Sequence, residues 1–171
     1  MKRLSCLIAC LALAASPFSA RAEHARIDLK LIHIDPDTGA EGDSVSANAD
    51  REPPAGGYND RPVAKVKAGE PLELAFFLTN TYPHGVIKDV TVRYYVVREE
   101  KIGQKAVPDL KKGTLTEGQF TMNFKPQCRV GAHVAFTVPE PGNYLLRVET
   151  LNTDSDHEHF SAIDVVADKA P

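Results

Sequence analysis

The chain has 171 residues, of which 43% are hydrophobic and 25% are charged, proportions typical of a single globular domain. Its formal net charge is −3 at pH 7. The chain therefore lacks the basic field with which proteins bind phosphate backbones, and we expect no nucleic acid among its partners.

Residues 1–22 have the features of a secretory signal peptide. The start is positively charged, residues 4–15 are almost uniformly apolar, and the sequence Ala-Arg-Ala ending at Ala22 is the small-x-small pattern that signal peptidase accepts. We predict cleavage between Ala22 and Glu23, which leaves one mature domain at residues 23–171. No stretch reaches the roughly 20 apolar residues that a membrane helix needs. We expect a periplasmic or secreted protein without a membrane span in its mature form.

The number of cysteines in the mature chain follows from this cleavage. Cys6 and Cys10 leave with the signal peptide, so Cys128 remains alone in a compartment where disulfides can form. We expect a small buried or half-buried thiol, with metal binding or an intermolecular disulfide as alternatives. A lipid on Cys10 is disfavoured, because the apolar stretch continues beyond that residue.

The mature chain alternates between short strand-like runs and turn residues. Residues 26–34 alternate apolar and polar side chains with the period of two that indicates a half-buried strand. Residues 35–61 are rich in Gly, Pro, Asp, Ser and Asn, and we predict a long irregular loop there. Further strand-like runs follow at residues 63–67, 72–80, 90–98, 120–124, 132–138, 144–148 and 160–166.

Seven to eight such strands, joined by turns with Pro or Gly, predict an all-β, immunoglobulin-like sandwich of two antiparallel sheets. Residues 99–113 are polar and rich in Lys, and we expect a hairpin or a single helical turn there. The charged run at residues 98–101 is expected to lie in solvent at a strand end. A chain of this size can bury about two thirds of its unfolded surface, so it needs no structural metal.

Two stretches resemble bacterial CARDB-like domains, which are immunoglobulin-like sandwiches related to cell adhesion. The first stretch comprises Val66-Lys67-Ala68-Gly69-Glu70-Pro71-Leu72-Glu73-Leu74, Thr79-Asn80 and Lys88-Asp89-Val90-Thr91-Val92-Arg93-Tyr94-Tyr95-Val96, and the second is Pro139-Glu140-Pro141-Gly142-Asn143-Tyr144-Leu145-Leu146-Arg147-Val148. The resemblance covers about half of the mature chain and concerns strands and turns, so it implies the fold only. The loop at residues 35–61 and the His-Glu-His segment depart from that group, so adhesion is not carried over.

His157 and His159 are the main candidates for metal ligands. In an extended strand their side chains point to the same face with Cβ atoms about 6 to 7 Å apart, so they can share one copper or zinc ion. A stable site needs a third ligand, for which we consider His33, on the buried phase of the first strand, or His133. The alternatives are a solvated acidic strand edge or a polar patch that recognises a partner.

A blue-copper centre is a poorer interpretation. Such a site needs one Cys, two His and usually a weakly bound Met that follows them closely. Cys128 and His133 have a plausible separation, but the one methionine of the mature chain, Met122, precedes the cysteine.

No motif in the chain positions catalytic groups. It lacks a Gly-x-Ser-x-Gly elbow, a His-Glu-x-x-His helix and a phosphate-binding Gly-rich loop. We therefore predict a non-catalytic binding or accessory module whose loops contact another exported protein or a surface polymer. The alternative is a periplasmic metal-binding protein that holds copper or zinc at the His-Glu-His segment.

Overall fold

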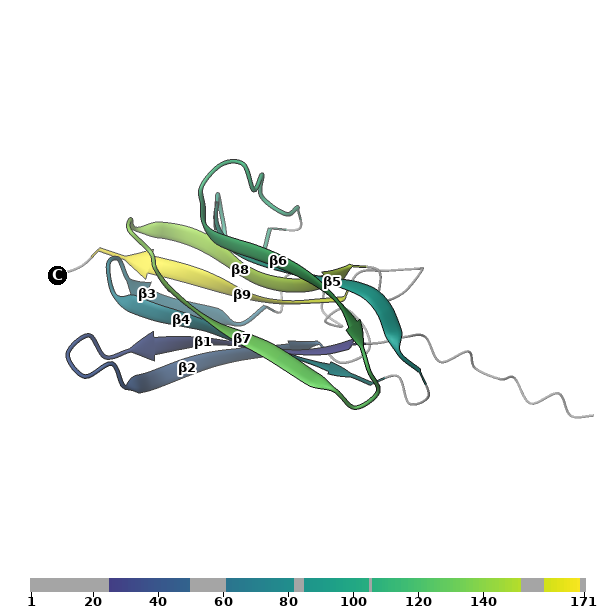
Figure 1. Cartoon of the computed structure of the whole chain (residues 1–171). Coiled ribbons are helices and arrows are strands. Elements are labelled where there is room, and N and C mark those ends of the chain that lie inside the picture. The colour runs from purple at the N-terminus through teal and green to yellow at the C-terminus, as the bar shows by residue number, and fades with distance from the viewer. Residues whose placement is uncertain (1–24, 50–60, 82–84, 105, 152–158, 170–171) are drawn as a thin grey trace, which may run out of the picture.

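The computed structural model describes residues 25–49, 61–81, 85–104, 106–151 and 159–169, which form two packed β-sheets (Figure 1). The strands in this part are Ala25–Ile34 (β1), Glu41–Ala49 (β2), Val63–Lys67 (β3), Pro71–Asn80 (β4), Ile87–Glu99 (β5), Thr114–Phe124 (β6), Arg129–Thr137 (β7), Gly142–Leu151 (β8) and His159–Asp168 (β9). The four-stranded sheet has the order β2-β1-β4-β7, and the five-stranded sheet has the order β3-β9-β8-β5-β6. The expected all-β sandwich is confirmed.

The period of two in the sequence produces the core between the sheets. In β1, Ile27, Leu29 and Leu31 are fully buried, whereas Arg26 and Lys30, on the opposite phase of the strand, are exposed. Alternate residues of β4, β5, β8 and β9 supply the facing side chains of one continuous core, although in β8 the residues of both phases are buried. Each fully buried aliphatic side chain contributes roughly 2 kcal/mol, so these strands account for most of the stability of the fold. Within the described part of the chain, no helix is long and apolar enough to cross a membrane.

The predicted loop at residues 35–61 is wrong in its middle part, which forms β2 against β1. Val45 and Ala47 of β2 pack against the core, but the neighbouring positions carry small polar residues. An edge strand needs only one sparse apolar face, so its composition resembles that of a loop. Pairing with β1, with Val45 opposite Leu31, determines its structure.

The turn between β1 and β2 shows why the chain reverses there. Asp35 Oδ1 accepts hydrogen bonds from the N–H groups of Asp37 at 3.0 Å and Thr38 at 2.8 Å, and Gly39 adopts a φ of 69°. These hydrogen bonds lower the pKa of Asp35, with the N–H of Thr38 as the largest contribution. Side-chain bonds to the following backbone and a glycine with positive φ are ordinary turn chemistry.

The expectation of seven to eight strands in two purely antiparallel sheets needs two corrections. Nine strands are present in the described residues, and β3 runs parallel to β9, with Val63 opposite Asp164. The parallel pair arises because β3 joins the five-stranded sheet beside the last strand of the chain, whereas β1 and β2 belong to the other sheet. Such a long-range pairing leaves no local mark in the sequence.

The described residues that connect β5 and β6, 100–104 and 106–113, contain no strand and no helix, in place of the expected hairpin or helical turn. They are irregular and lie over the outer face of the five-stranded sheet, where Leu110 packs against a second, smaller apolar cluster. That cluster consists of Tyr95, Val97, Leu145, Phe160 and Ala162. Glu99, expected in solvent, is buried at this end of β5, with only 5% of its surface exposed.

The CARDB-like motif residues have structural roles in this fold. Asn80, buried at the end of β4, donates through Nδ2 to the carbonyl of Phe124 at 2.7 Å and of Gly85 at 3.2 Å. The hydroxyl of Tyr144 donates a hydrogen bond to the carbonyl of Glu140 at 2.8 Å, and this bond stabilises the turn before β8. Both residues satisfy backbone carbonyls at strand ends, so the motif stabilises turns.

Candidate functional site

The histidines proposed as third ligands lie on opposite faces of the four-stranded sheet. His33 follows the inward phase of β1, and its Nδ1 is 2.9 Å from Glu70 Oε1. His133 of β7 points outward beside Ala75, with its Nδ1 2.5 Å from Glu73 Oε1. Each imidazole therefore has its own carboxylate partner, and the two do not face each other.

His159 begins β9, where its main chain pairs with Thr150; its side chain and His157 lie outside the described residues. His33 lies near the other end of β9. Its partner Glu70 is two residues after Ala68, and the N–H of Ala68 donates to the carbonyl of Asp168, the last residue of β9, at 2.8 Å. An extended strand as long as β9 spans about 30 Å. The fold thus places His33 near the end of β9 that is opposite to the His159 main chain.

The described residues include no group of three or more His, Cys, Asp or Glu side chains arranged to hold a metal ion. Cys128 is half-buried against the core and forms no disulfide with another described residue. The pair of His157 and His159 stays a prediction.

A groove of about 410 Å³ crosses the outer face of the four-stranded sheet. All four strands line it, with Arg26, Asp28, Leu29, Lys30 and Ile32 from β1, Glu41, Ser46, Ala47 and Asn48 from β2, Ala75 and Phe77 from β4, and Arg129 and His133 from β7.

Strand register creates this groove. Ala75 lies between Lys30 of β1 and His133 of β7, and Phe77 lies opposite Gly131. Ala75 thus keeps the floor low between longer side chains, and Gly131 leaves space for the ring of Phe77. Because outward positions on neighbouring strands align in rows, residues far apart in the sequence line one depression.

Phe77 is the centre of the groove. The guanidinium carbon of Arg129 lies 4.1 Å from the centroid of its ring, and the imidazole of His133 meets it edge-on, with centroids 5.9 Å apart. Asp28 forms ion pairs with two arginines. Its Oδ1 is 2.9 Å from Arg26 Nε, and its Oδ2 is 3.9 Å from Arg129 Nη2. The result is an apolar platform whose rim both donates and accepts hydrogen bonds.

One signal for this groove was present in the sequence. Phe77 and Ala75 are apolar although they occupy the outward phase of β4, where alternation calls for polar side chains. Arg129 carried no such signal, because a charged residue at a strand start is common on any surface. Its role depends on the pairing of β4 with β7.

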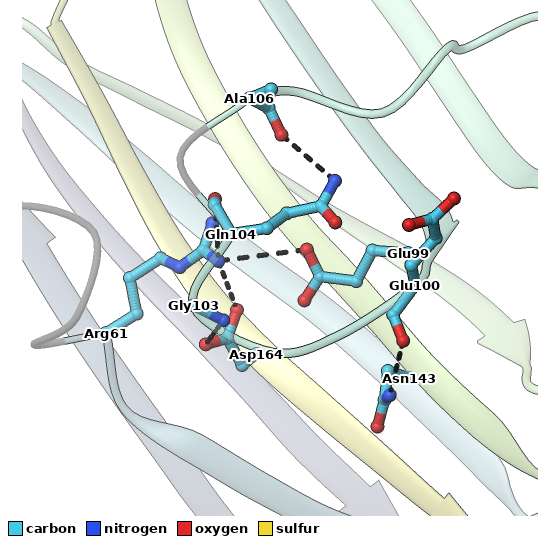
Figure 2. A network of polar contacts seen from close by, with 8 residues as sticks. All are labelled: Arg61, Glu99, Glu100, Gly103, Gln104, Ala106, Asn143 and Asp164. Carbon is cyan, nitrogen blue, oxygen red and sulfur yellow. Dashed lines mark hydrogen bonds and ion pairs between the residues drawn. The ribbon is translucent and has the colours of Figure 1, made fainter.

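A buried ionic cluster lies on the outer face of the other sheet, under residues 100–113 (Figure 2). Arg61 Nη2 is 2.8 Å from Asp164 Oδ1 and 3.7 Å from Glu99 Oε2. All three side chains are at least 97% buried. Burial is the main cause that raises the pKa of Glu99 to about 7; the negative charge of Asp164 adds to it and Arg61 opposes it. Burial also raises the pKa of Asp164.

No known family profile and no curated protein sequence matches this chain. Among solved structures, the soluble domain of PmoD from Methylocystis sp. (Rockwell) is similar at 11% identity and a TM-score of 0.45, over 82% of this chain and 90% of that domain. A chitin binding domain from Burkholderia pseudomallei is similar at 14% identity and a TM-score of 0.41, over 90% of this chain and 83% of that one.

A third similar structure, a family 123 glycoside hydrolase from Clostridium perfringens, has 10% identity and a TM-score of 0.41. The match covers 63% of this chain but only 22% of the hydrolase. At these TM-scores, none of the three proteins assigns a ligand or an activity to this chain.

Proposed function

We propose that this chain is an exported, non-catalytic binding module, and that the groove over β1, β2, β4 and β7 holds a surface polymer of the polysaccharide class. The observation that carries the proposal is the platform of Phe77 and Arg129 in a shallow groove with a polar rim. The signal-peptide pattern of residues 1–22 supports export.

The chemistry of the groove suits a sugar chain. Sugar rings present C–H faces that pack on aromatic rings, and hydroxyl groups that both donate and accept hydrogen bonds. Phe77 offers the apolar contact, while Asp28, Asn48 and Arg129 offer acceptors and donors around it. The groove lies on a rigid sheet, so it is largely preformed, which limits the entropic cost of binding. The binding surface is then a sheet face, in place of the loops expected from the sequence.

Co-sedimentation of the mature chain with insoluble peptidoglycan, cellulose and chitin tests the proposal. We expect at least one polymer to retain the protein, and Phe77→Ala or Arg129→Ala to weaken retention about tenfold or more, which corresponds to at least about 1.4 kcal/mol. Lys65→Ala, an exposed change on β3 of the other sheet, is the matched control and should bind like the wild type.

Three results would count against the proposal. Retention by none of the polymers removes the polysaccharide class, and capture of an exported protein through the same groove residues would assign the groove to a protein partner. Retention that survives both groove substitutions would place the binding surface elsewhere. Urea unfolding of each variant shows that any loss of binding is not a loss of folding.

A further inference from the structure

Strand β7 is a free edge of the four-stranded sheet, and in the described part of the chain it pairs with β4 alone. Its register with β4 is continuous, from Arg129 opposite Thr79 to Thr137 opposite Pro71. The strand contains no Pro, Lys, Asp or Glu, and its one arginine stands at its first position. β7 is therefore a long, regular edge with few features that discourage pairing with another strand.

The other three edge strands do carry such features. β3 has only five residues and exposes Lys65 and Lys67. β2 exposes Glu41 and Asp43, and its register with β1 shifts once. β6 exposes Glu117, and its register with β5 shifts twice. Charged side chains and irregular registers hinder edge-to-edge pairing, so β7 differs from the other three edges.

The inward side chains of β7 are only half-buried, although they pack against the core. These residues are Val130, Ala132, Val134 and Phe136. Leu74 of β4, opposite Val134, is by contrast fully buried. β6, the edge of the other sheet on the same side of the sandwich, likewise leaves Phe120 and Met122 partly exposed (Figure 1). The described residues thus leave the core partly uncovered along this side.

Alternate residues of β7 direct their main-chain groups to the free edge. In an antiparallel pair, hydrogen-bonded residue pairs alternate with non-bonded pairs. The N–H of Asn80 donates to the carbonyl of Cys128 at 3.1 Å, so steps of two residues assign the bonds with β4 to the inward residues of β7. Pro71, which has no N–H, accordingly lies opposite Thr137 on the non-bonded phase. The N–H and C=O groups of Gly131, His133 and Ala135 are left for another strand.

A second copy of β7 fits this edge in the antiparallel direction. With His133 on a two-fold axis the whole strand is paired, and Val130 meets Phe136 of the second copy while Ala132 meets Val134. On the outward face the small Gly131 meets Ala135, and Arg129 meets the neutral Thr137. Because each His133 contacts Glu73 of its own chain, the two imidazoles on the axis do not meet as unbalanced charges.

We propose that β7 is the interface of a symmetric homodimer, in which the four-stranded sheets of two copies join edge to edge into one continuous sheet. Main-chain hydrogen bonds at Gly131, His133 and Ala135 connect the two edges. The half-buried inward side chains of β7 become covered by those of the second copy. A second copy thus satisfies both the free main chain and the uncovered apolar side chains of this edge.

The dimer also joins the two grooves of the four-stranded sheets. Arg129 and His133 line the groove and belong to β7, so the grooves of both copies lie side by side on one sheet face. A polymer long enough to enter both is held more tightly than one groove allows. This gain in affinity rests on the proposed function, whereas the dimer itself needs no ligand.

Sedimentation velocity of the mature chain, without any polymer, tests the dimer. We expect a monomer–dimer equilibrium with a Kd of about 50 µM or lower. Ala135→Pro removes an N–H that faces the free edge and leaves the bonds to β4 in place, so it should raise this Kd about tenfold or more. Ser44→Pro is the matched control, because Ser44 is exposed on β2, the opposite edge of the same sheet, and should dimerise like the wild type.

Amide hydrogen exchange of the wild-type chain locates the interface without a variant. When the protein concentration rises from about 5 µM to about 500 µM, exchange at Gly131, His133 and Ala135 should slow about threefold or more. The N–H of Ser44, at the opposite edge, should exchange at the same rate throughout.

Four results would overturn the proposal. The first is a chain that stays monomeric up to about 500 µM. The second is a dimer whose Kd a folded Ala135→Pro variant leaves unchanged, with folding checked by urea unfolding. The third is protection that grows with concentration at β2, β3 or β6 in place of β7. The fourth is pairing of β7 with a strand of another exported protein while this chain remains monomeric, which would assign the edge to that partner.

Discussion

Phe77 lies across Gly131 of the neighbouring strand, and its ring occupies the space that a side chain at position 131 would need. A Cβ atom built on Gly131 would be 2.5 Å from Phe77 Cδ1 and would also collide with the carbonyl oxygen of Phe76. The groove on the four-stranded sheet therefore depends on a glycine on β7 as much as on the aromatic ring.

We expect Gly131→Ala to lower the free energy of unfolding by about 2 to 3 kcal/mol, because a backbone atom blocks the new methyl group. The displaced ring of Phe77 should also abolish binding in the groove. Gly118→Ala on β6 is the matched control, since its Cβ would meet the hydroxyl and ring of the half-buried Tyr94 side chain and no backbone atom. Urea unfolding of both variants checks the order, and an equal loss would contradict it.

Stability should depend on pH through Glu99. Its pKa is about 7 in the folded chain against 4.5 as the ordinary value, so the contribution is fully present below pH 4.5 and is lost as the pH rises through 7. We expect the free energy of unfolding to fall by roughly 3 kcal/mol over this window. The raised pKa of Asp164 acts in the same direction. Glu99→Gln should flatten the curve, and a fall that persists unchanged in that variant would disprove the assignment.

Removing the cation of the cluster should be costly. Arg61→Met leaves two buried carboxyl groups without their cation, and we expect a loss of about 3 to 5 kcal/mol near neutral pH, with a smaller loss at low pH where both are protonated. Arg26→Met, which breaks an exposed pair with Asp28, serves as the control and should cost about 1 kcal/mol or less. Thermal unfolding at two pH values measures both, and similar losses for the two variants would contradict the prediction.

Copper or zinc binding, if it resides at the His-Glu-His segment, should depend on two side chains. Calorimetric titration of the mature chain with Cu²⁺ and Zn²⁺ should give a binding signal that the double variant His157→Ala, His159→Ala removes. His33→Ala and His133→Ala should leave the signal unchanged, because the fold holds these residues on opposite sheet faces with carboxylates of their own. A signal that survives the double variant would end the metal hypothesis for this segment.

The sequence alone determined the fold class and most of the strands, because alternation of apolar and polar side chains is a local property that directly records which face of a strand is buried. The sequence also held a signal for Phe77, an apolar residue on the outward phase of β4, but only the structure showed the groove that it lines. Only the tertiary structure decided that residues 41–49 pair as β2, that β3 runs parallel to β9, and that Glu99 is buried beside Asp164. These features depend on contacts between residues far apart in the chain. The stabilising free energy of such a contact depends on the distant residue, so it leaves no pattern among the residues next to it in the sequence.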